Sequence, residues 1–246
     1  MNAFHLKVIA LTTMIIDHLG AVFPEIFGFG FRVVGRVAFP IYVYLVAEGF
    51  RHTKSPKRFL LRLGIFALLS EPAFDVAIRG AEFPWGVDFF NHTNIFYTLF
   101  FGGAAIYLFQ MVSAKINSWL GKALAVLPLL ILMWLAESVV TSDYGAYGVA
   151  FIFIMYAIQG IKLRLAAMAV MCVWQHRTLV RHIIMYLRYD EIILVPGIFI
   201  MMIPATLIAV VLVAFYNGER GRSFKWFFYA SYPVHLFVLG LLSIIF

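Results

Sequence analysis

An apolar stretch near the N-terminus contains the first residues able to do chemistry, Lys7, Asp17 and His18, in the run K-V-I-A-L-T-T-M-I-I-D-H-L-G. An ionisable side chain in a bilayer-spanning helix costs at least ~2.5 kcal/mol, so such residues usually face protein, water or a substrate path. Lys7 and His18 are 11 positions apart. At about 100° per residue they share one helix face, about 16 Å apart along the axis. The pattern predicts a functional site, although Asp17 and His18 could instead only satisfy each other and a partner helix.

Two further pairs of charged residues interrupt apolar segments. Arg32 and Arg36 are spaced i, i+4, and so are Glu71 and Asp75. Each pair repeats one charge on one helix face, where like charges repel. Because breaking a buried ion pair typically costs ~3 to 5 kcal/mol, we expect the arginine face to meet the acidic face. A purely structural ion network is the alternative.

The last apolar segment contains Y-A-S-Y-P-V-H, which places Ser231 and His235 on one helix face at i, i+4. Pro233 between them predicts a kink. A single imidazole in such a segment is either a structural or a functional residue, and the spacing leaves both open.

Composition predicts the fold class. Of the 246 residues, 63% are hydrophobic and only 13% are charged, with a mean hydropathy of +0.94, whereas a soluble domain has roughly 25% charged residues. We expect an all-α, polytopic bundle in contact with membrane lipids, forming one transmembrane domain over residues 1–246. Basic loops explain the excess of 19 Lys and Arg over 12 Asp and Glu, so nucleic acid is not an expected partner. Cys172 is the only cysteine, which excludes an intramolecular disulfide and a cysteine metal cluster, and no metal site is expected.

A span needs about 20 apolar residues, and the hydrophobic pattern predicts about nine of them. Pro24 is expected to end the first, with a loop at Gly28 and Gly30. Residues 79–94 are too polar and too broken by Gly and Pro to span, and residues 175–191 resemble an amphipathic surface helix. The predicted spans are residues 4–23, 32–50, 59–78, 95–112, 119–139, 147–160, 163–174, 192–216 and 226–246.

The distribution of basic residues predicts the orientation. Thirteen of the 19 Lys and Arg fall on the same side as the N-terminus, and positive charge favours the cytoplasmic side. The N-terminus is therefore expected in the cytoplasm and the chain in the inner (cytoplasmic) membrane. The densest basic run, R-H-T-K-S-P-K-R at residues 51–58, then lies at the cytoplasmic face.

Several sequence blocks together resemble the TraX family, membrane proteins linked to N-terminal acetylation of conjugative pilin. They are L-K-V-I-A-L-T-T-M-I-I-D-H-L-G-A-V-F, G-R-V-A-F-P-I-Y-V-Y-L-V-A-E-G-F-R-H-T, L-L-S-E-P-A-F-D, D-Y-G-A-Y-G, N-G-E-R-G and Y-P-V-H-L. The resemblance runs nearly end to end. TraX proteins in turn resemble the wider group of transmembrane acyltransferases, which is marked by Arg or Lys, ten residues and then His in the first helix. Lys7 and His18 fit that spacing.

The resemblance implies transfer of an acetyl group from cytoplasmic acetyl-CoA to an acceptor amine on a pilin-like N-terminus or another peptide. His18 would be the general base, because an imidazole can take a proton at neutral pH, and Asp17 would favour its protonated form. Arg32 or Arg36 would stabilise the oxyanion or hold a carboxylate of the acceptor. The remaining candidate catalytic residues are Glu71, Asp75 and His235.

The phosphates of the cofactor need cationic residues at the cytoplasmic face, where the basic run could otherwise serve only as a topology signal. The residues expected to bind them are Lys7, Arg51, Lys54, Lys57, Arg58 and Arg62.

Two other functions stay open. In an ion-coupled transporter or proton pathway, Glu71, Asp75 and His18 would form a relay, but the inverted repeats or paired broken helices of that class are not found. A non-catalytic pilus-assembly factor would tolerate loss of His18. The acceptor, a direct or acyl-histidine route and the oligomeric state are not determined by the sequence.

Overall fold

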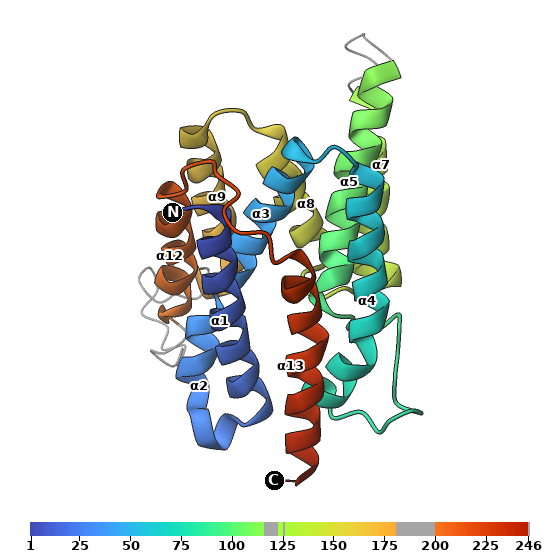
Figure 1. Ribbon diagram of the computed structural model, residues 1–246, viewed down its shortest axis with the longest axis vertical. Helices are drawn as coiled ribbons and strands as arrows, with labels where there is room; N and C mark the ends of the chain where they lie inside the picture. The colour runs from blue at the N-terminus through green and yellow to red at the C-terminus, as the bar shows by residue number, and fades with distance from the viewer. Residues whose placement is uncertain (116–122, 125, 181–199, 246) are drawn as a thin grey trace, which may run out of the picture. The chain divides into compact units, whose positions relative to one another are not determined.

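The computed structural model describes residues 1–115, 123–124, 126–180 and 200–245, and these are almost entirely helical (Figure 1). Within these ranges the only β feature is an isolated parallel bridge between Thr93 and Ser142. The all-α prediction is therefore confirmed.

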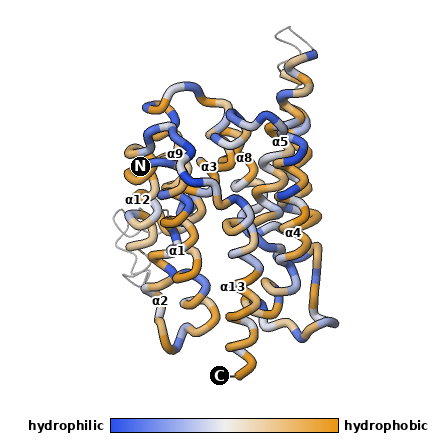
Figure 2. Tube along the Cα trace, in the orientation of Figure 1, coloured by the Kyte–Doolittle hydropathy of each residue, from blue (hydrophilic) through white to orange (hydrophobic). Residues whose placement is uncertain are grey.

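Four of the described helical stretches are long and apolar enough to cross a membrane. They are Ala3–Val22, Pro24–His52, Ile95–Lys115 and Lys225–Ile245. Hydrophobic residues predominate along them (Figure 2). Shorter apolar helices accompany them, so the protein has the helices of a membrane protein, whereas the number of nine spans is not confirmed.

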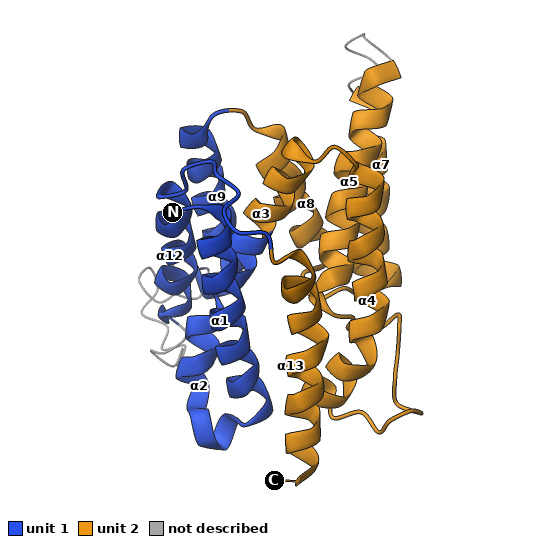
Figure 3. Ribbon diagram, viewed as in Figure 1, with its two compact units in different colours: residues 1–42, 160–223 blue, residues 43–159, 224–246 orange. Residues whose placement is uncertain are grey.

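The chain divides into two compact units (Figure 3), and the single domain expected over residues 1–246 stays a prediction. The first unit consists of residues Met1–Tyr42 and Gly160–Ser223, and the second of residues Val43–Gln159 and Phe224–Phe246.

The first unit pairs its helices two by two, with α1 on α2 and α9 on α12. These helices are α1 (Ala3–Val22), α2 (Pro24–Gly35), α9 (Ile161–Gln175) and α12 (Met202–Ala214). The side chain of Asn2 caps α1 by accepting from the backbone N–H of His5 at 3.2 Å. Next to this cap, Met1 and Ala3 are hydrogen-bonded to the segment after α12. The terminal ammonium group donates to the Phe215 carbonyl at 2.6 Å, and the Ala3 N–H donates to the Glu219 carbonyl at 2.8 Å. The start of α1 is thereby tied to this segment.

The turn after α1 differs from the expected loop. Pro24 is the first residue of α2, because its fixed φ and missing N–H suit the first helical turn. The expected break remains only at Gly28, whose φ of 64° interrupts the helix. The span predicted to begin at Arg32 therefore starts earlier and is formed by α2 and α3 together.

In the second unit, α4 packs against both α5 and α13, and α5 packs against α7 and α8. α3 begins in the first unit and ends in the second. The elements are α3 (Ala38–His52), α4 (Pro56–Arg79), α5 (Ile95–Lys115), α7 (Leu127–Trp134), the π-helical turn η1 (Leu135–Val139), α8 (Gly145–Ala157) and α13 (Lys225–Ile245).

Most predicted spans coincide with one of these helices to within a few residues, as α4, α5, α9 and α13 illustrate. Four predictions extend beyond the described residues: the start of the span at 119–139, the start of the span at 192–216, the last residue of the span at 226–246, and most of the amphipathic helix at 175–191.

Candidate functional site

Asp17 lies between two arginines in the first unit. Its Oδ2 accepts from Nη1 of Arg32 at 2.5 Å, and its Oδ1 accepts from Nη2 of Arg36 at 2.6 Å. Arg36 Nε also donates to the Arg32 carbonyl at 3.0 Å. The Asp17 side chain is only 12% exposed, against 31% for Arg32 and 16% for Arg36. The three residues thus form a partly buried ionic cluster, which we call the arginine site.

Close contact between α1 and α2 produces this arrangement. A Cβ atom on Gly35 would lie 2.1 Å from Oδ1 of Asp17, and one on Gly20 would lie 2.7 Å from Cβ of Phe31. Both distances are shorter than van der Waals contact, so only glycine fits at these two positions. The glycines let the two helices approach closely enough for Asp17 to reach both guanidinium groups.

Within the arginine site, two guanidinium groups share the carboxylate of Asp17. Guanidinium groups fixed in this way can stabilise an anion or a developing negative charge. Both carboxylate oxygens of Asp17 accept from arginine, so Asp17 holds the two guanidinium groups in place.

The sequence predicted that the helix face with Arg32 and Arg36 meets the face with Glu71 and Asp75, because neither pair was expected to have another partner. Arg32 and Arg36 have Asp17 as their counter-charge. Asp75 forms its ion pair with Arg79, and Glu71 accepts hydrogen bonds from Asn94. Three of the four residues therefore have a charged partner on a nearby helix or on their own helix, which the prediction did not consider.

His18 and Lys7 are both half-buried residues of α1. His18 directly follows Asp17, which places its imidazole on the helix that supplies the carboxylate of the arginine site. Lys7 lies near the start of α1, where the charge of Arg220 acts on it. Arg220 follows the segment that binds the N-terminus, so two cations gather at this end of α1.

His176 is a further polar residue of the first unit, which the sequence pattern did not single out. Its Nε2 lies 2.8 Å from Oγ1 of Thr206, whose hydroxyl donates to the Met202 carbonyl at 2.7 Å. Nε2 is therefore the donor, and Nδ1 carries the lone pair of the neutral ring. Burial, and then the charge of Arg36, lower the pKa of His176. A neutral imidazole thus lies within electrostatic range of the arginine site, and its position just after an apolar stretch was the available signal.

Glu71 and Asn94 form a buried polar pair in the second unit, and both are 0% exposed. Oε2 of Glu71 accepts from the Asn94 backbone N–H at 3.1 Å and from the Asn94 amide. The same amide nitrogen also donates to the Ala67 carbonyl at 2.8 Å. Asn94 therefore joins the start of α5 to the middle of α4.

Asp75, one turn after Glu71, closes the loop between α4 and α5. Its Oδ1 accepts from Nη1 of Arg79 at 2.9 Å and its Oδ2 from the backbone N–H of Asp88 at 2.7 Å. Arg79 also donates to the Asn91 carbonyl at 3.0 Å. Asp75 thus has a structural role, and the i, i+4 spacing of Asp75 and Arg79 was the signal for it.

His235 and Ser231 lie on one face of α13 as predicted, but their side chains are not directly bonded to each other. Nδ1 of His235 is 2.7 Å from the Ser231 carbonyl, and the Ser231 hydroxyl donates to the Phe227 carbonyl at 2.6 Å. Since a carbonyl only accepts, Nδ1 carries the hydrogen and the lone pair of the neutral ring is on Nε2. The ring of Tyr232 packs edge-on against that of His235, with centroids 5.6 Å apart.

Arg51, expected to bind a cofactor phosphate, caps α8 instead. Its Nη2 donates to the carbonyls of Met155 at 3.2 Å and Ile158 at 2.7 Å, and also to that of Tyr156. Nη1 donates to Oε1 of Gln159 at 3.1 Å. The last carbonyls of a helix lack partners within the helix and attract cations, so the guanidinium group has a structural role.

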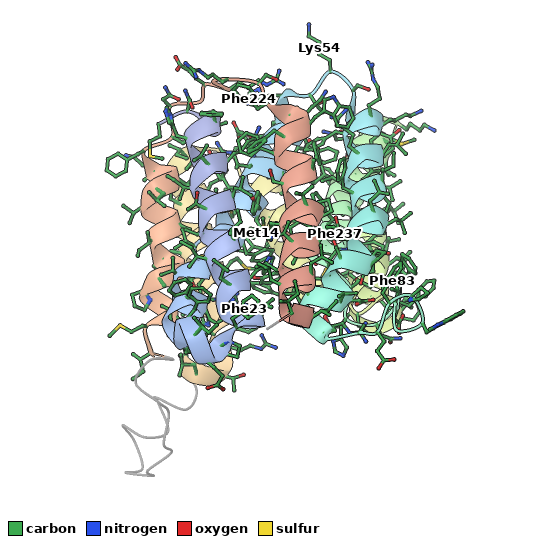
Figure 4. All side chains as sticks on the ribbon, turned by 60° about the horizontal axis from the view of Figure 1, so that its bottom comes forward. Met14, Phe23, Lys54, Phe83, Phe224 and Phe237 are labelled. Atoms are coloured by element: carbon green, nitrogen blue, oxygen red, sulfur yellow. The ribbon has the colours of Figure 1, made fainter. Side chains whose placement is uncertain are left out.

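The remaining cations of the basic run, and Arg62 after it, differ in how exposed their side chains are. Arg62 is half-buried, with its guanidinium 5.8 Å from the ring centre of Phe59 and 5.9 Å from that of Tyr229. Lys54, Lys57 and Arg58 are exposed, and the Lys54 side chain reaches away from the helices (Figure 4). The open part of the run is therefore residues 54–58. Among the described residues no group of three His, Cys, Asp or Glu could hold a metal ion.

The helices and the arginine site define a helical membrane protein with a buried ionic cluster, and comparison with known proteins narrows this class. The model of the family described as TraX protein matches residues 3–243. The chain is 26% identical over 252 residues to the probable fimbrial assembly protein FimC, serogroup H1, of Dichelobacter nodosus, covering 97% of this chain and 94% of that protein. No solved structure matches. The chain belongs to the TraX family, which confirms the resemblance inferred from the sequence blocks.

Proposed function

We propose that the protein is an acetyl-CoA-dependent N-acyltransferase of the inner membrane, with its N-terminus in the cytoplasm and a pilin-like or other peptide amine as acceptor. The observation that carries the proposal is the arginine site. Asp17 of α1 holds the guanidinium groups of Arg32 and Arg36, and His18 is the next residue after Asp17 in the chain. Membership of the TraX family, and a relative whose name describes a probable fimbrial assembly protein, support a role linked to pili.

The reaction assigns a separate task to each group. The acceptor amine attacks the thioester carbon, a C–N bond forms, and the C–S bond breaks to release the thiolate of coenzyme A. His18 takes the proton that the amine loses and passes it to the leaving thiolate. The guanidinium groups of Arg32 and Arg36 stabilise the oxyanion of the tetrahedral intermediate. Asp17 acts on the arginines by fixing their positions.

The cofactor phosphates are assigned to cations near the cytoplasmic side. Lys54, Lys57 and Arg58 remain in this set because their side chains are exposed, and Lys7 remains because it lies near the start of α1 with Arg220 in electrostatic range. Arg51 is removed from the set because its guanidinium group caps α8.

The test is acetyl transfer by the purified protein in detergent. Radiolabelled acetyl-CoA is incubated with the protein and short peptides that have either a free or a blocked N-terminus. We expect label on the free-amine peptides only. Full pilus-related activity in cells together with no transfer to any peptide, and no binding of acetyl-CoA, would favour the non-catalytic assembly factor instead.

A further inference from the structure

One oxygen of Glu71, a fully buried residue of the second unit, lacks a hydrogen-bond partner. The residue is 0% exposed, and both hydrogen bonds from Asn94 reach Oε2, whereas Oε1 has no hydrogen-bond partner. Buried polar atoms are nearly always hydrogen-bonded. A fully buried carboxylate that uses one oxygen and leaves the other open is therefore a place where a bound group can add donors.

The hydroxyl of Tyr97 is a second open polar atom near Glu71. Tyr97 is on α5, one turn after Asn94, and its buried hydroxyl oxygen has no hydrogen-bond partner. The charges of Glu71 and Asp75 both act on this hydroxyl. Two neighbouring elements thus each present an unused oxygen, one from α4 and one from α5.

The charge balance indicates what could fill the site. Asp75 is paired with Arg79 and accepts from the Asp88 N–H, so its charge is compensated. Among the described residues, no Lys, Arg or His lies within ion-pair distance of Glu71. A buried carboxylate without a counter-charge is unfavourable, and an occupant that carries positive charge would relieve it.

We infer that Glu71 Oε1 and the Tyr97 hydroxyl together bind a primary ammonium group. An ammonium brings one positive charge and three N–H donors, which match one uncompensated carboxylate and a hydroxyl that can accept. A divalent metal fits less well, because Ca²⁺ and Mg²⁺ take six or more oxygen ligands. On the proposed function, from which this inference takes its ligand, the ammonium is one carried by the acceptor peptide.

Titration with n-butylammonium, using n-butanol as the uncharged probe of the same shape, tests the site. The purified full chain is titrated in detergent at neutral pH, and the shift of its thermal unfolding temperature gives the dissociation constant. We expect n-butylammonium to stabilise the parent and Glu82→Gln, an exposed acid in the loop after α4, with equal affinity. Glu71→Gln should bind it at least tenfold more weakly. Equal stabilisation by n-butanol, or unchanged affinity in Glu71→Gln, would overturn the inference.

Glu71→Gln is expected to fold, because the side-chain amide keeps an oxygen for the Asn94 donors. Should this variant not fold, Tyr97→Phe is the second test, since it keeps the carboxylate and removes only the hydroxyl. We expect its affinity for n-butylammonium to fall at least threefold, and unchanged affinity would contradict the site.

Two results distinguish failure of the ammonium site from failure of the proposed acyltransferase function. Glu71-dependent binding of n-butylammonium with no acetyl transfer to any peptide would support the ammonium site and count against the acyltransferase. Acetyl transfer with the same KM for the peptide amine in the parent and Glu71→Gln would support the acyltransferase and overturn the site.

Discussion

At the scale of single residues, the arginine site is defined by one carboxylate shared between two guanidinium groups. Asp17 uses both oxygens on Arg32 and Arg36, which fixes the positions of both guanidinium groups. His18 follows Asp17 in the chain, and His176 is close enough to sense the charge of Arg36. Two imidazoles of the first unit therefore compete for the role of general base, and His235 of α13 is the third candidate.

Replacing each of these histidines with alanine should rank them. A general base typically contributes ~100-fold to 10,000-fold in rate. If His18 is the base, His18→Ala should lose acetyl transfer by at least 100-fold and bind coenzyme A as the parent does, whereas His176→Ala and His235→Ala should keep more than a tenth of the rate. The measurement is radiolabel transfer to a free-amine peptide, with coenzyme A affinity measured in parallel. A His18→Ala protein with more than a tenth of the parental rate would exclude this role.

At the scale of elements, the contact of α1 with α2 depends on glycine. A Cβ on Gly35 would meet Oδ1 of Asp17 at 2.1 Å, whereas a Cβ on Gly30 in the same helix would meet nothing within 4 Å. The pair offers a matched test of whether close packing of the two helices holds the arginine site together.

Gly35→Ala should destabilise the protein, and Gly30→Ala should not. Forcing extra volume into a packed contact typically costs ~1 to 3 kcal/mol, while alanine in an open helical position gains up to ~1 kcal/mol over glycine. Unfolding in denaturing detergent, followed by circular dichroism, measures both. Equal stability of the two variants would show that α1 and α2 can move apart at no cost.

A second element-scale prediction separates structural from ligand-binding cations. Arg51→Gln removes the donors that cap α8, so it should lower stability by ~1 to 3 kcal/mol and leave the affinity for coenzyme A within twofold. Lys54→Gln with Lys57→Gln should do the opposite, because these side chains are exposed. Thermal unfolding of each variant measures the structural role of the cation, and equilibrium binding of coenzyme A measures its role in ligand binding. An affinity that falls only in Arg51→Gln would return Arg51 to the cofactor site.

At the scale of the whole molecule, the orientation in the membrane can be read at the two ends of α4. Lys54 precedes this helix and Phe83 follows it, and both side chains are exposed in loops (Figure 4). α4 is not among the four stretches that are long and apolar enough by composition, but it contains the span predicted at residues 59–78. Its 24 residues make it about 36 Å long, more than the ~30 Å hydrocarbon core of a bilayer. The two loops should therefore lie on opposite sides of the membrane.

Single cysteines at these positions test the topology. Cys172 is buried, and Cys172→Ala removes it as a background. In intact cells a membrane-impermeant maleimide should label Phe83→Cys, and it should label Lys54→Cys only after the membrane is opened. The reverse pattern would place the N-terminus outside the cytoplasm and move the basic run away from cytoplasmic acetyl-CoA.

The sequence by itself determined the helical membrane class, the family, most helix positions and the types of the candidate residues. Hydrophobic length and spacing are local properties, so they can be read without the fold, as for α5 from Ile95 and α13 near Trp226. The start of α2 at Pro24 was missed because proline both ends one helix and begins the next.

Only the tertiary structure decided which charges pair. Arg32 and Arg36 could meet any buried acid, and the choice of Asp17 follows from the close contact that Gly35 allows between α1 and α2. Likewise, Arg51 caps α8 and His176 bonds to Thr206, and both interactions join residues far apart in the chain. The fold also leaves one oxygen of Glu71 without a hydrogen-bond partner. Distances of a few ångströms between helices set these partners, because hydrogen bonds and ion pairs act only at short range, and helical periodicity contains no information on those distances.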